Sequence, residues 1–112
     1  MPAVRFARYD TLAEAFGAPV LLDDSDPLGR LDLRLDGAGT AYVVGLAGGA
    51  ERVPLTLWKI SADNAVASER IAELRGGRST GFPRLALDGE QGWVAYTDTE
   101  ANRVVITKIA LR

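Results

Sequence analysis

The sequence predicts an all-β protein built from repeated four-stranded antiparallel units. The clearest signal is in residues 81–98, where two apolar runs, 85–87 and 93–96, flank a glycine-rich turn of the kind that joins the strands of a hairpin. In addition, residues 33–44 match residues 85–96 position by position, at an offset of 52 residues. A repeat of about 50 residues with four short strands in each unit is the period of a β-propeller blade. We therefore predict a partial β-propeller of about two and a quarter blades.

Length and composition agree with a single domain, residues 1–112, and exclude several kinds of chemistry. With 47% apolar residues the chain can supply one core. It has no cysteine, which excludes disulfide bonds, thiolate zinc sites and a cysteine nucleophile, and no histidine, the commonest general base. The 13 basic and 15 acidic residues are interspersed, so we expect neither a nucleic-acid nor a membrane partner, and no cofactor. No signal segment is evident, and the sequence does not indicate a compartment.

Residues 4–22 are expected to form an incomplete blade of two strands. Residues 4–9 alternate between apolar and polar side chains, which is typical of a half-buried strand, and residues 19–22 form a second short strand. Between them, residues 11–14 have the spacing of a helix-capping box, and Gly17 is placed to end one helical turn, so we interpret this segment as a structured connection rather than a full helix. Four aspartates follow, which are Asp23, Asp24, Asp26 and Asp32. We interpret them as a solvated turn rather than a calcium site, because their spacing does not match an EF-hand loop.

Residues 30–74 are expected to form one complete blade. Its first strand has Leu31, Leu33 and Leu35 on one face, because side chains alternate along a strand. The next strand, residues 41–46, is nearly all apolar. A strand with no polar face should be covered on both sides, so we expect this blade to have a neighbour on each side.

The outer half of this blade contains an ambiguous segment. Residues 53–60 are expected to form a third strand. Residues 65–74 could be helical, because Ala, Glu and Arg dominate there and Gly76 and Gly77 would end a helix. We interpret them as an outer strand, because the repeat requires a fourth element before the next hairpin.

Residues 82–111 are expected to form strands one to three of a further blade. Within them, residues 104–106 repeat residues 55–57 at an offset of 49 residues. The whole chain then has nine predicted strands. Nine short antiparallel strands also allow a small β-sandwich or a closed barrel, which is the alternative fold.

Several short segments together point to a known family. They are residues 4–8, 16–20, 26–30, 81–84 and 93–98. This set resembles the C-terminal part of sialidase-like (BNR repeat) β-propeller proteins. The family's Asp box, Ser-x-Asp-x-Gly-x-Thr-Trp/Phe, would fall on residues 9–16, where only Phe16 agrees. Because members of the family form six-bladed rings, the resemblance implies either a fragment or a chain that assembles with copies of itself, such as a trimer with about two blades from each copy.

The resemblance also implies where a ligand would bind. Sialidases hold the substrate carboxylate with a triad of arginines, and the first strands of propeller blades line a central channel. The candidate ligand-binding residues near these positions are Arg30, Arg34, Arg78, Arg84, Tyr96 and Asp98. The family's tyrosine nucleophile and its glutamate cannot be placed, so no catalytic residue and no metal ligand is assigned. Trp58 and Trp93 either stack on a sugar or pack between sheets.

Three functions follow as hypotheses. The favoured one is a non-catalytic sialidase-like β-propeller segment that self-associates into a homo-oligomer and binds a glycan or a protein through its top loops. Those loops are residues 24–30, 47–52, 75–81 and 98–102. The alternative is a sialidase-like glycoside hydrolase that is active only as an assembled propeller, with Arg84 and a carboxylate such as Asp98 or Glu100 in its site. The third is a domain with no small-molecule ligand.

Overall fold

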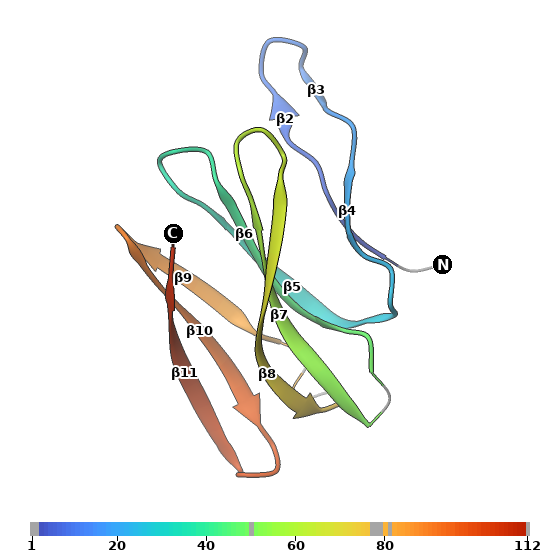
Figure 1. Cartoon of the computed structure of the whole chain (residues 1–112), viewed down its shortest axis with the longest axis vertical. Helices are drawn as coiled ribbons and strands as arrows, with labels where there is room; N and C mark the ends of the chain where they lie inside the picture. The colour runs from blue at the N-terminus through green and yellow to red at the C-terminus, as the bar shows by residue number, and fades with distance from the viewer. Residues whose placement is uncertain (1–2, 50, 77–79, 81, 112) are drawn as a thin grey trace.

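The computed structural model describes residues 3–49, 51–76, 80 and 82–111, and in these residues every regular element is a β-strand (Figure 1). The eleven strands are β1 (Val4–Phe6), β2 (Tyr9–Asp10), β3 (Ala15–Phe16), β4 (Val20–Asp23), β5 (Pro27–Leu35), β6 (Ala41–Ala47), β7 (Arg52–Ile60), β8 (Val66–Arg75), β9 (Arg84–Asp88), β10 (Gln91–Asp98) and β11 (Arg103–Ala110). They form four antiparallel sheets, ordered β1-β4, β2-β3, β5-β6-β7-β8 and β11-β10-β9. The all-β prediction is confirmed. Because no sheet of the described residues closes into a barrel, the barrel alternative is wrong.

The differences from the predicted strands have local causes. The alternating stretch 4–9 is divided into β1 and β2, and Ala15–Phe16 adds β3, so the nine predicted strands become eleven. The ambiguous segment 65–74 is the outer strand β8, as interpreted from the repeat. β5 begins at Pro27, inside the predicted loop, because its first two residues already pair with β6 before a bulge.

The sheet β5–β8 is a meander whose central strands, β6 and β7, are covered on both faces. Its strands pair in sequence order, and every residue of β6 is buried, so the predicted coverage of residues 41–46 on both sides is confirmed. One face carries the first core, which consists of Tyr42, Val44, Leu46, Val53, Leu55, Leu57 and Leu74 with Leu85, Val94 and Ile109 of the last sheet. The other face carries the second core, which consists of Ala41, Val43, Trp58 and Ile60 with Val4 and Phe6.

The three-stranded sheet β9–β11 covers the first-core face, at the lower left of Figure 1. Polar contacts join it to the central sheet at both ends of β11. The hydroxyl of Tyr42 donates to the carbonyl oxygen of Leu111 at 2.9 Å. Arg52 Nη1 pairs with Glu100 Oε1 in the β10–β11 turn at 2.7 Å. These contacts hold the last sheet in one position over the first core.

The hairpin of β1 and β4 covers the second-core face from the other side, at the upper right of Figure 1. Arg8 fastens it to the end of β7. The guanidinium of Arg8 donates to Asn64 Oδ1 (2.8 Å) and to the carbonyl oxygens of Ile60 (3.1 Å) and Ser61 (2.7 Å). Because the second core draws on β6 and β7, the hairpin lies over these strands and leaves β5 partly uncovered.

The far end of this hairpin is a short two-stranded tip, β2–β3, without the helical turn predicted there. Asp10 Oδ1 accepts the backbone N–H groups of Leu12 (2.9 Å) and Ala13 (3.2 Å), so an Asx turn closes the tip instead. The rings of Tyr9 and Phe16 pack edge to face across the tip, with centroids 5.2 Å apart.

Candidate functional site

Two of the predicted ligand-binding arginines meet where β5 lies against β9, a line that we call the inner seam. At its centre, Asp32 Oδ1 lies 3.0 Å from Arg34 Nη1, and Asp32 Oδ2 lies 3.3 Å from Arg84 Nε. Oδ2 also accepts the backbone N–H of Leu85 at 2.7 Å. The Asp32 side chain is 15% exposed. This carboxylate therefore neutralises two arginines and satisfies a backbone group at the edge of β9.

Arg30 is a third arginine at the inner seam. Its guanidinium lies over the ring of Phe82, 5.5 Å from the ring centroid, in cation–π geometry. Arg30, Asp32, Phe82 and Arg84 contribute to the lining of a hollow of about 260 Å³. The lining holds two guanidinium groups and one carboxylate, so an anion is the ligand that its charge favours. The seam arginines do not form an open triad for a ligand carboxylate, however, because the carboxylate of Asp32 already pairs with Arg34 and Arg84.

The remaining predicted residues lie away from the inner seam or outside the described residues. Tyr96 follows Ala95, the partner of Arg84, so its side chain points to the opposite face of the sheet and packs against the first core. Asp98 ends β10, and its Oδ1 accepts two backbone N–H groups of the β10–β11 turn at 3.1 and 3.2 Å. Arg78 lies outside the described residues.

The side of β9–β11 that points away from the central sheet carries an apolar patch beside Arg84, Thr97 and Lys108, and we call this patch the tail face. Its members are Ala86, Trp93, Ala95, Val104 and Ile106, which share one side because Trp93 pairs with Ala86 and Ala95 with Ile106. Val104 and Ile106 are each 68% exposed. A groove of about 300 Å³ lies between tail-face residues and the two seam arginines, Arg34 and Arg84. In the part of the chain that the structure describes, no sheet covers this face.

A second apolar surface, the head face, lies on β5 at the other end of the stack. It consists of Leu31, Leu33 and Leu35, which are about half exposed. Leu33 pairs with Val43 of the second core, so these leucines lie on the second-core side, beside the first hairpin. A groove of about 450 Å³ runs between them and the hairpin, and it is lined by Phe6, Ala7, Arg8, Tyr9, Phe16, Leu33 and Leu35.

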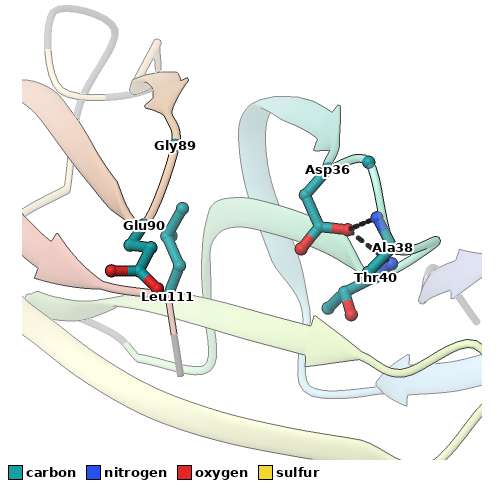
Figure 2. A pocket seen from close by; sticks show the side chains of 7 residues that line it. Asp36, Ala38, Thr40, Gly89, Glu90 and Leu111 are labelled. Carbon is teal, nitrogen blue, oxygen red and sulfur yellow. Dashed lines mark hydrogen bonds between the residues drawn. The ribbon is translucent and has the colours of Figure 1, made fainter.

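A further hollow, of about 400 Å³, lies between the β5–β6 and β9–β10 turns (Figure 2). On the side formed by the β5–β6 turn, Asp36 Oδ1 accepts hydrogen bonds from the backbone N–H groups of Ala38 and Thr40, both at 2.9 Å. The hydrogen bond from Thr40 is the main cause that lowers the pKa of Asp36. Burial, ahead of the neighbouring charge of Asp36, raises the pKa of Tyr42, whose hydroxyl lies 3.3 Å from Asp36 Oδ2. The carboxylate of Asp36 is therefore engaged in closing its own turn.

Two of the clustered aspartates, Asp23 and Asp32, are also engaged in local structure. Asp23 Oδ1 accepts the backbone N–H of Ser25 at 2.6 Å, and Asp32 serves the inner seam. Among the described residues, no three acidic side chains are grouped so that they could hold a metal ion. The described chain likewise contains no helix that is long and apolar enough to cross a membrane. Within the described residues, the head face and the tail face are thus two exposed apolar surfaces that no neighbouring sheet fully covers.

Sequence reasoning identified the seam arginines, but it placed Asp32 in a solvated turn and assigned Val104 and Ile106 only as part of a repeated strand. Asp32 lies between two leucines, as an ordinary exposed strand residue does. The neighbouring sequence therefore does not indicate that its carboxylate contacts β9. Val104 and Ile106 did have a signal. Residues 104–106 form an apolar run with no polar face, a pattern typical of a strand covered on both sides.

The fold and these surfaces define a class of protein, an all-β protein of stacked antiparallel sheets with an uncovered apolar face at each end of the described stack. Comparison of the chain with protein-family models, curated proteins and solved structures found no match. The resemblance to sialidase-like proteins is therefore carried by the short sequence segments alone, and the function has to be argued from the two faces.

Proposed function

We propose that this chain is a non-catalytic, sialidase-like β-propeller segment whose function is to self-associate, with a second copy of the chain covering the tail face. The arrangement of the strands supports this proposal. The meander β5–β8 has the strand order of a propeller blade. The chain then passes from the outer strand β8 to β9, and β9 lies against β5, as the innermost strands of neighbouring blades do.

The pairing registers support the equivalence of β5–β7 and β9–β11. In each sheet, three residues on neighbouring strands lie side by side in one cross-strand row. The row in the central sheet is Leu33, Val43 and Trp58, and the corresponding row in the last sheet is Leu85, Val94 and Thr107. Along this row the offsets are 52, 51 and 49 residues. The offset of 52 found in the sequence therefore applies to β9, whereas β10 is displaced by one residue, which exchanges the faces that its side chains occupy.

The observation that carries the proposal is a difference in exposure between equivalent positions of β7 and β11. Leu55 and Leu57 of β7 are 0% exposed, because β9–β11 covers them. Val104 and Ile106, which occupy the equivalent places 49 residues later, are 68% exposed. Burying a side chain of this size contributes about 1.5–3 kcal/mol, so the tail face has a large driving force to acquire a cover.

A second copy is the cover that the molecule itself suggests. The chain already packs one of its own sheets on the equivalent face of β5–β8, so a complementary surface is encoded in the same sequence. The head face offers a further exposed apolar surface for the contact. The resemblance to six-bladed proteins sets the expected stoichiometry, a closed ring of three copies that contribute about two blades each.

One observation favours a second candidate function, the binding of an acidic glycan at the tail face. Trp93 shares a groove with Arg34 and Arg84, and an aromatic ring beside guanidinium groups suits a sugar that carries a carboxylate. Such a ligand would cover the same side chains as a second copy. Both candidates predict that Trp93 is shielded from solvent. Self-association predicts shielding by a second copy alone, whereas glycan binding predicts shielding only when the sugar is present.

Collisional quenching of tryptophan fluorescence by acrylamide separates these candidates. Trp58 is buried in the second core, so Trp93 supplies the quenchable signal. Self-association predicts that the quenching of Trp93 falls as the protein concentration rises, and that Ile106→Asp abolishes this dependence. Protection that requires added sialic acid, at every protein concentration, would instead support the glycan. Quenching that neither concentration nor sialic acid changes would contradict both.

A further inference from the structure

The interface inside the chain joins two unlike faces. The side of β9–β11 that packs on the first core carries Leu85, Val94 and Ile109. By register these residues are equivalent to Leu33, Val43 and Ile60, which lie on the second-core side of β5–β8. The internal interface therefore pairs the first-core side of the central sheet with the side of the last sheet that is equivalent to the second-core side. An interface of this kind is heterologous, and repeating it gives a ring or a filament rather than a twofold dimer.

The second-core side of the central sheet has one strand that remains uncovered. The first hairpin contacts Ala41 and Val43 of β6 and Trp58 and Ile60 of β7. It leaves the leucines of β5 about half exposed. The groove of about 450 Å³ between the hairpin and β5 is lined by Leu33 and Leu35 on one side and by hairpin residues on the other, which are Phe6, Ala7, Arg8, Tyr9 and Phe16. The groove is thus the uncovered part of the second-core side. On β9–β11, the equivalent side is the one that packs against a neighbouring sheet.

On the basis of the proposed self-association, we infer that copies of the chain join head to tail. In this arrangement the tail face of one copy lies against the head face of the next copy. Both surfaces are apolar and exposed, and each is of the face type that the internal interface pairs with the other. A twofold tail-to-tail contact would instead pair two faces of the same type, which the chain does nowhere among its described sheets.

Two single-face variants test this inference when they are mixed. Leu35→Asp places a charge on the head face and leaves the tail face intact, whereas Ile106→Asp does the reverse. Each variant alone should be monomeric in sedimentation velocity. An equimolar mixture should form a dimer of one copy of each, because one intact head and one intact tail remain. Native mass spectrometry with one partner labelled with ¹⁵N identifies that heterodimer.

A matched control accounts for the charge itself. Val66→Asp introduces the same carboxylate on the outer strand β8, at the edge of the central sheet opposite the head face on β5, and it should assemble like the wild type. If either test variant loses its β-sheet circular dichroism, Leu35→Thr and Ile106→Thr replace the pair.

The outcomes separate the inference from the function on which it rests. A Leu35→Asp variant that still dimerises by itself would show a tail-to-tail contact, which overturns the head-to-tail inference but keeps self-association. A mixture that remains monomeric while the wild type assembles would also overturn the inference. A wild type that is monomeric at every concentration would instead overturn the proposed function.

Discussion

The carboxylate of Asp32 in β5 accepts a hydrogen bond from the backbone N–H of Leu85 in β9, at 2.7 Å and across 53 positions of sequence. β9 is an edge strand of its sheet, and edge strands expose backbone groups that can pair with other chains. Asp32 satisfies one of these groups and also pairs with Arg34 and Arg84. It therefore fixes the relative position of two sheets through a single carboxylate.

Replacing Asp32 should destabilise the protein more than replacing an exposed aspartate. In Asp32→Ala the N–H of Leu85 loses its acceptor, which costs about 1–3 kcal/mol of unfolding free energy. Asp32→Asn keeps an amide oxygen as acceptor and should recover part of that loss. Urea denaturation followed by circular dichroism measures both. Asp88→Ala, an exposed position at the end of β9, is the control and should change the unfolding free energy by less than about 0.5 kcal/mol. Equal losses for Asp32→Ala and Asp88→Ala would contradict the role of the inner seam.

A methyl group added at Gly45 should force the half-exposed side chain of Leu31 to move aside. Gly45 lies in the buried strand β6, and a Cβ at this position would collide with the side chain of Leu31. Gly45→Ala should therefore cost about 0.5–1.5 kcal/mol of unfolding free energy, the cost of displacing Leu31 from its preferred rotamer. The double variant Leu31→Ala/Gly45→Ala should be more stable than the sum of the two single changes predicts. Strictly additive losses in a thermal or urea denaturation cycle would show that the two positions are not coupled.

The stability of the protein should depend on the ionisation of Asp36 at acid pH. Backbone hydrogen bonds hold the pKa of Asp36 below its ordinary value of 3.8 in the folded chain, the bond from Thr40 most of all. A lowered pKa in the folded state means that the stabilising contribution is fully present above the pKa of the unfolded chain. It is lost as the pH falls through the pKa of the folded chain.

Two measurements check this pH dependence. The Asp36 carboxyl carbon, followed by NMR, should titrate below pH 3.8. Asp36→Asn should be less stable than the wild type at neutral pH, and the difference should shrink as acid protonates Asp36 in the wild type. A midpoint at or above 3.8, or a stability difference that grows with acid, would show that the turn does not depend on the charged carboxylate.

Equivalent positions of β7 and β11 should respond differently to truncation in the isolated chain. Leu57→Ala removes a fully buried side chain and should cost about 2–5 kcal/mol of unfolding free energy. Ile106→Ala removes an exposed one and should change that free energy by less than about 0.5 kcal/mol in dilute protein. At high concentration Ile106→Ala should weaken assembly, whereas the wild type gains stability through mass action. A loss of several kcal/mol for Ile106→Ala in dilute protein would show that the tail face is already covered within one chain.

Local patterns predicted most of the strands. Alternating polarity located β1 and β5, the apolar run of β6 correctly required cover on two sides, and the repeat identified β8 as a strand despite its helix-forming residues. The short tip β2–β3 could not be predicted in this way. Two residues in each strand are too few for a periodic pattern, and Asp10, whose carboxylate closes the turn, precedes the residues that resembled a capping box.

The candidate site was less predictable, because it depends on contacts between distant residues. The seam arginines were identified from their places at the first strands, but the position of Asp32 between Arg34 and Arg84 follows only from the approach of β5 to β9. The face of each β10 side chain depends on a turn that is one residue shorter than its counterpart, which moved Tyr96 away from Arg84. A shift of one residue exchanges the faces of a strand, and sequence matching does not resolve it.

The central claim is that the tail face is covered by another copy of the chain, and the mass of the wild-type protein in solution tests it most directly. Light scattering behind size-exclusion chromatography should give a mass that rises with concentration from 12.0 kDa toward three times that value. A mass that stays at 12.0 kDa at every concentration would contradict the claim.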